Sequence, residues 1–164
     1  MIQTLPQVAH EHHEVLLQHV NLMPEVGDVI LEADGAEVKR RADEMGTFLT
    51  ATLIPHVDAA ERTLYPELER MLQNRHSMAP MRREHAEVRR LAADFARLAG
   101  EIDGPRVSIG ARLAIRRVLF QLYALLKIHL AEEEAYLRIV EHGVSDDVAE
   151  VLAAGLDHPG FHTA

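Results

Sequence analysis

The chain has 164 residues and a formal net charge of -9, which argues against nucleic acid or an anionic membrane surface as its main partner. It contains no cysteine, so disulfides, iron–sulfur clusters and cysteine-ligated zinc are excluded. We expect a soluble, cytoplasmic protein, since the start does not resemble a signal peptide and the longest apolar run is too short to span a membrane.

Apolar residues at three- and four-residue steps predict four long helices, whereas strand-like alternation is scarce. The predicted helices cover approximately residues 5–31, 36–73, 78–102 and 108–141. The apolar stripe of the first helix is interpreted as Leu5, Val8, His12, Val15, His19 and Leu22. Pro24 and Gly27 are expected to kink or fray this helix, and Pro55 and Pro66 to bend the second one.

Short connections between four long helices predict an all-α fold, namely an up-down-up-down four-helix bundle. We assign residues 1–144 to this bundle. Residues 145–164 are expected to form a short C-terminal helix, from Ser145 through Ala154, followed by a tail.

Eleven residues are histidine, and one histidine lies on the apolar stripe of each predicted helix. These four residues are His12, His56, His85 and His129. The first two are 44 residues apart, as are the last two, and a shift of 73 residues superposes EHHEV (11–15) on EHAEV (84–88). The repeat indicates a helical hairpin used twice, which would bring the four imidazoles together in the middle of the bundle.

A carboxylate follows the fourth of these histidines by about one helical turn. Glu133 comes four residues after His129, so both side chains are expected to face the core. Burying an ionised glutamate without a cation costs on the order of several kcal/mol. Imidazoles and carboxylates suit iron, manganese or zinc, so the pattern favours a buried metal centre over histidines that are hydrogen-bonded within the core.

The segments HVDAAERTLYPEL (56–68), EH (84–85) and HLAEEE (129–134), with a histidine on the first helix, resemble the hemerythrin-like family of HHE cation-binding domains. The resemblance covers roughly residues 8–140. It implies a four-helix bundle with a non-haem di-iron centre that binds dioxygen, nitric oxide or peroxide, or that senses iron. By position it implies the following metal ligands: His12, His56, His85, His129 and Glu133.

The chain departs from the family pattern at Ala60, where a carboxylate is usual four residues after the second-helix histidine. Glu61 comes next, but on an ideal helix it is rotated by about 140° from His56. We hypothesise that Glu61 nevertheless bridges the metals, because Pro55 removes a backbone hydrogen bond and allows the helix to widen locally.

Met81 stands where oxygen-carrying hemerythrins have a further histidine. Fewer nitrogen ligands leave a coordination position open, which favours reactive chemistry or sensing over reversible oxygen transport. Among the neighbouring residues, His13 is expected on the surface and His19 in the core or an end layer. Glu84 and Glu134 are interpreted as surface charges or as hydrogen-bond partners of the ligands.

These observations predict a non-haem protein with two carboxylate-bridged iron ions per chain, although zinc or manganese would also suit the ligands. It would bind dioxygen, nitric oxide or peroxide in sensing, storage or detoxification. Binding is favoured over an enzymatic activity that consumes peroxide or oxygen. The alternatives are an iron-responsive interaction module and a bundle whose degenerate site holds one metal or none.

Overall fold

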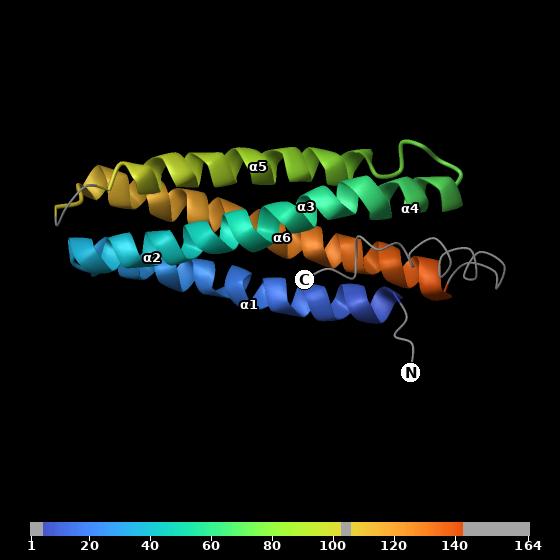
Figure 1. The fold of residues 1–164 in the computed structure, drawn as a ribbon, viewed down its shortest axis with the longest axis horizontal. Helices are drawn as coiled ribbons and strands as arrows, with labels where there is room; N and C mark the ends of the chain where they lie inside the picture. Colours follow the sequence, from blue (N-terminus) through green and yellow to red (C-terminus); the bar gives the residue numbers. More distant parts are fainter. Residues whose placement is uncertain (1–4, 103–105, 143–164) are drawn as a thin grey trace.

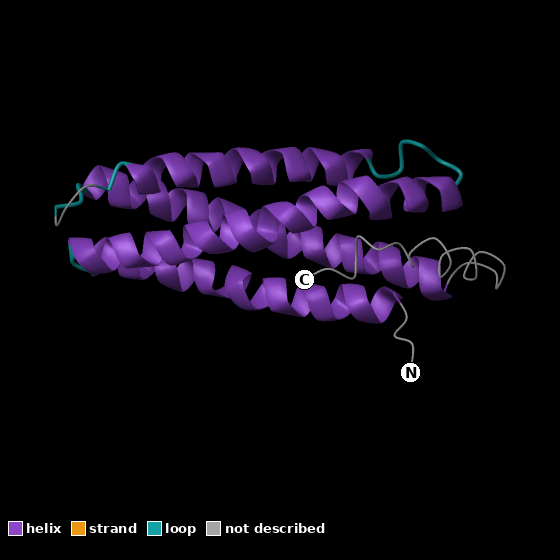
Figure 2. Ribbon diagram, in the orientation of Figure 1, coloured by secondary structure: helices purple, strands orange, loops and turns teal. Residues whose placement is uncertain are grey.

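The computed structural model describes residues 5–102 and 106–142, and within these ranges every regular element is a helix. Four helical rods lie side by side along the long axis of the molecule (Figure 1). The rods are α1 (Leu5–Glu32); a second rod of α2 (Gly35–Phe48), η1 (Leu49–Leu53), α3 (Ile54–Ala59), η2 (Ala60–Leu64) and α4 (Tyr65–Met71); α5 (Ala79–Gly100); and α6 (Ile109–His142). Figure 2 shows loops only between the rods. The predicted all-α bundle is confirmed for this part of the chain.

Two helix starts follow from side chains that accept backbone hydrogen bonds. The Asp34 carboxylate accepts the N–H of Glu37 at 2.9 Å at the start of α2, and the Ser108 hydroxyl accepts the N–H of Ala111 at 3.1 Å before α6. These contacts satisfy backbone donors that the first helical turn leaves unpaired. The C-terminal helix predicted from Ser145 lies outside the described residues.

The second rod is a continuous helix that widens twice. Its two π-helical segments, η1 and η2, each end two residues before a proline, namely Pro55 and Pro66. A proline ring inside an α-helix clashes with the carbonyl four residues earlier, and a wider turn moves that carbonyl away. The repeated sequences TLIP (52–55) and TLYP (63–66) carry this feature. The distortion expected around Pro55 is therefore present.

Gly27 lies where α1 packs closely on α6. A Cβ atom at this position would lie 3.2 Å from both the Arg116 and the Phe120 side chains of α6. The helix continues through Pro24 and Gly27 to Glu32, so the predicted fraying of its later part does not occur. Among the described residues, no helix is both long enough and apolar enough to cross a lipid bilayer.

The core consists of two apolar clusters with a polar layer between them. On α5, Met81 belongs to the smaller cluster and Val88 to the larger one, and the buried His85 lies between them along the helix. On α6, Glu133 lies in the same way between Leu130 and Leu137. The bundle thus surrounds a buried layer of imidazole and carboxylate groups.

Candidate metal centre

The polar layer contains two groups of potential metal donors that share Glu133. The donor atoms of His13, His56 and Glu133 lie within 4.8 Å of one another, and so do those of His85, His129 and Glu133. One histidine therefore comes from each rod, and the carboxylate comes from α6. Each group could hold one cation, and the two groups have the Glu133 carboxylate in common.

Glu133 is nearly inaccessible to solvent, at 1% exposure, and neither of its carboxylate oxygens has a hydrogen-bond partner. The Nε2 atoms of His13 and His56 lie 3.1 Å and 3.5 Å from its Oε2 atom, but these contacts lack hydrogen-bond geometry. The His56 Nε2 atom is also unpartnered. A buried ionised group left unpaired costs on the order of several kcal/mol, so these atoms fit a cation.

Three of the four histidines are oriented by carboxylates that lie outside the two groups. The Nδ1 hydrogen bonds are His13 to Glu134 at 3.1 Å, His85 to Glu61 at 3.1 Å and His129 to Glu84 at 2.8 Å. A carboxylate beside Nδ1 accepts a hydrogen bond from the Nδ1–H group. This keeps the proton of the neutral ring on Nδ1 and leaves the Nε2 lone pair free to coordinate a metal.

In the second group, of His85, His129 and Glu133, this orientation turns two Nε2 atoms toward each other. The Nε2 atoms of His85 and His129 lie 3.0 Å apart, although both rings donate through Nδ1. Two nitrogen lone pairs facing each other at this distance repel unless a proton or a cation lies between them. Burial, and next the neighbouring His129, lower the pKa of His85 to about 4, which keeps this imidazole neutral and able to coordinate.

The charge on Glu133 is maintained by the surrounding rings. Burial opposes ionisation, but the contacts with His13 and His56 outweigh it and hold the pKa of Glu133 well below its usual value. Burial likewise opposes a charge on His13, yet Glu133 and Glu134 raise the pKa of His13. A cation that binds in the first group would compete with protonation of His13.

The structure brings together four of the six residues predicted as ligands: His56, His85, His129 and Glu133. Glu61 lies beside the centre, outside both groups, and is partly exposed. It accepts hydrogen bonds from His85 Nδ1 at 3.1 Å and from Arg89 at 2.9 Å. The π-helical turn η2 therefore places Glu61 against the outer nitrogen of His85.

On α1 the structure places His13, the residue next to the predicted ligand His12, in the first group. The expectation that His13 lies on the surface was wrong, since His13 is 4% exposed and is a member of the first group. His12 is half-buried and stacks on the His56 ring, with 5.0 Å between the ring centroids. It belongs to neither group.

The α1 stripe was also misread beyond this position. Val15 and Leu22 are each 48% exposed, and His19 is exposed rather than in the core or an end layer. Over residues 10–32 of α1, the buried positions are instead His13, Leu16, Val20, Met23, Val26, Gly27 and Ile30. A stripe followed along the full length of the helix would have indicated this face, because its apolar residues continue to Ile30.

Sequence reasoning missed Tyr65, which directly follows η2 and is fully buried. Its hydroxyl donates to His85 Nε2 at 3.1 Å, and its ring stacks on the His85 ring at 5.2 Å. Burial, and next the charge of Glu133, raise the pKa of Tyr65, so the phenol keeps its proton. The signal available in the sequence was its position within the HVDAAERTLYPEL segment.

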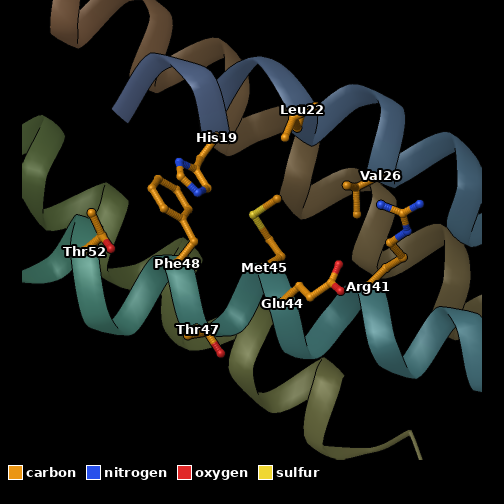
Figure 3. Close-up of a pocket in the computed structure, with 9 residues that line it drawn as sticks. All are labelled: His19, Leu22, Val26, Arg41, Glu44, Met45, Thr47, Phe48 and Thr52. Carbon is orange, nitrogen blue, oxygen red and sulfur yellow. The ribbon is translucent and has the colours of Figure 1, made fainter. Parts of the chain in front are cut away.

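A cavity of about 380 Å³ lies elsewhere, between α1 and the α2–η1 segment (Figure 3). His19 and Phe48 stack across it, with ring centroids 4.6 Å apart. None of the donor residues lines this cavity. It is therefore separate from the metal centre.

Comparison with known proteins identifies one family model, the hemerythrin HHE cation binding domain, which matches residues 5–137. All donors of both groups lie within the matched range. No curated protein and no solved structure matches the chain.

Proposed function

The chain belongs to the hemerythrin family of HHE cation-binding domains, and from this premise we propose that it holds two iron ions per chain and binds a small ligand at them. The ligand would be dioxygen, nitric oxide or peroxide, in sensing, storage or detoxification. The observation that carries the proposal is the buried Glu133, whose two oxygens lack hydrogen-bond partners among four imidazoles.

In the proposed centre, His13 and His56 would hold one ion, His85 and His129 would hold the other, and Glu133 would be available to both. Bound iron would supply open coordination positions at which a small ligand binds. Each group offers three protein donors, so positions remain for an exogenous ligand. The carboxylates of Glu134, Glu61 and Glu84 hold the rings in the orientation that points Nε2 inward.

This assignment differs from the ligand set expected from the sequence at two positions. We propose His13 as the α1 ligand instead of His12, because His13 is buried against Glu133 whereas His12 is half-buried and stacks on the His56 ring. We propose that Glu61 orients His85 and does not bridge, because its carboxylate contacts Nδ1 and Arg89.

The remaining parts of the proposal follow from the sequence. The four rods are proposed to run up-down-up-down, which lets short loops bring one histidine from each rod to the same layer. The protein is proposed to act in the cytoplasm. It is also proposed to have neither nucleic acid nor a membrane as a partner, in keeping with its formal net charge of -9. An iron-responsive interaction module is the second candidate, because the buried unpaired carboxylate couples metal occupancy to the stability of the bundle.

Elemental analysis of protein purified without added metal, with an optical spectrum before and after exposure to air, tests the proposal. We expect two irons per chain and an oxo-bridged charge-transfer band in the wild type. Glu133→Ala should lose both, whereas Glu132→Ala, at an exposed neighbouring position, should keep both. Zinc alone, absence of metal, or full iron content in Glu133→Ala would refute the di-iron assignment.

A further inference from the structure

The Tyr65 hydroxyl lies on the inner side of the second donor group. It contacts Nε2 of His85, the same atom that lies 3.0 Å from Nε2 of His129. The carboxylates that orient the histidines contact Nδ1 instead, on the outer side of each ring. The Tyr65 hydroxyl therefore lies on the side of the coordinating Nε2 atoms, and not on the side of the carboxylates that bind Nδ1.

The packing around Tyr65 holds the phenol in this position. Its ring is fully buried and lies nearly parallel to the His85 ring, with 16° between the planes. Arg82 covers the Tyr65 ring at 5.6 Å, and the buried Met81 belongs to the same apolar cluster. Met81 offers only a weakly basic thioether, so the phenol oxygen is the harder donor at this end of the centre.

Coordination of a cation by His85 would remove the hydrogen-bond acceptor of Tyr65. The Nε2 lone pair cannot accept the phenol proton and bind a metal at the same time. A buried hydroxyl that loses its hydrogen-bond partner is destabilised. The nearest way to compensate this loss is for the oxygen to turn its own lone pairs toward the cation.

We infer that Tyr65 is an additional ligand, as a phenolate, of the cation held by His85, His129 and Glu133. This inference rests on the proposed function. The phenol O–H bond breaks, an oxygen–metal bond forms, the proton leaves to solvent, and no electron is transferred. The positive charge of the cation stabilises the phenolate at neutral pH, as it does other coordinated groups.

Ferric phenolate absorbs visible light, which gives a readout independent of any activity. Iron-loaded, air-oxidised protein should show a visible band whose resonance Raman spectrum contains phenolate ring vibrations. Tyr65→Phe should lose these vibrations, and Tyr136→Phe, a half-buried control, should retain them. Phenolate vibrations that persist in Tyr65→Phe, or that are absent from wild type holding two irons, would overturn the inference.

A second measurement uses the wild-type chain and does not depend on whether a variant folds. The chain has three tyrosines and no tryptophan, so its near-ultraviolet difference spectrum reports tyrosine ionisation. Addition of Zn²⁺ at neutral pH should ionise one tyrosine per chain. Tyr65→Phe should show no such ionisation and should bind the metal about tenfold or more weakly, at least as large an effect as losing an outer hydrogen-bond partner of a ligand.

The two proposals fail in different ways. Zinc uptake by the wild type without tyrosine ionisation would overturn the role of Tyr65 and leave the metal centre intact. A wild-type chain that takes up no metal would overturn the proposed function and this inference together.

Discussion

The carboxylate oxygens of Glu133 distinguish the centre from an ordinary cluster of buried histidines. Rings such as those of His85 and His129 are commonly satisfied in a core by a carboxylate on Nδ1, and both rings have one here. Glu133 has no such explanation, because it is buried and both of its oxygens lack a hydrogen bond. A cation accounts for Glu133 and for the facing Nε2 atoms at once.

At the same scale, the choice between His12 and His13 can be tested by removing each ring. His13→Ala should reduce the iron content from two per chain to one, because the first group would retain only His56 and Glu133. His12→Ala should retain two, since His12 belongs to neither group. Elemental analysis of both variants, with His19→Ala as an exposed control, decides the assignment. Loss of iron in His12→Ala with retention in His13→Ala would restore the register expected from the sequence.

At the scale of the element, α1 shows where sequence reasoning failed. Two apolar stripes compete on this helix, one through Val15 and Leu22 and one through Leu16 and Val20. Both have helical spacing near the N-terminus, and tertiary packing on α6 buries the second. The stripe through Val15 and Leu22 includes His12, so His12 was predicted as the ligand. Neighbouring residues on a helix differ by about 100° in direction, so His13 lies on the other, buried stripe.

The second rod shows the opposite outcome. Proline predicted its distortion, and the structure contains a π-helical turn before both Pro55 and Pro66. The direction that Glu61 takes could not be predicted, because Glu61 lies inside η2 and its direction depends on how far the wide turns rotate the chain. The same rotation brings Tyr65 to His85, which explains why periodicity alone did not identify Tyr65.

At the scale of the whole molecule, the 73-residue repeat predicts that histidines meet in one layer, but not which α1 histidine joins the donor groups. Glu61 and Glu134 are equivalent under the repeat, and each accepts a hydrogen bond from a histidine of the centre. The repeat equivalent of His85 is His12, yet His13 contacts Glu134. The two halves therefore differ by one residue at this point, and a sequence repeat cannot reveal such a difference.

The free energy of unfolding should respond to metal differently in the wild type and in Glu133→Met. Glu133→Met removes a buried carboxylate whose oxygens lack hydrogen bonds, so this variant should be at least as stable as the wild type in chelator. With metal present at about 1,000 times its dissociation constant, the wild type should gain about 4 kcal/mol. Urea unfolding with and without metal measures both differences. A wild type that metal does not stabilise would argue against the centre.

Anomalous X-ray scattering at the iron edge, from crystals of the iron-loaded protein, tests the metal centre most directly. The account predicts two iron peaks inside the bundle, one beside His13 and His56 and the other beside His85 and His129, with Glu133 between them. Iron peaks found only at the protein surface, with none in this layer, would contradict it.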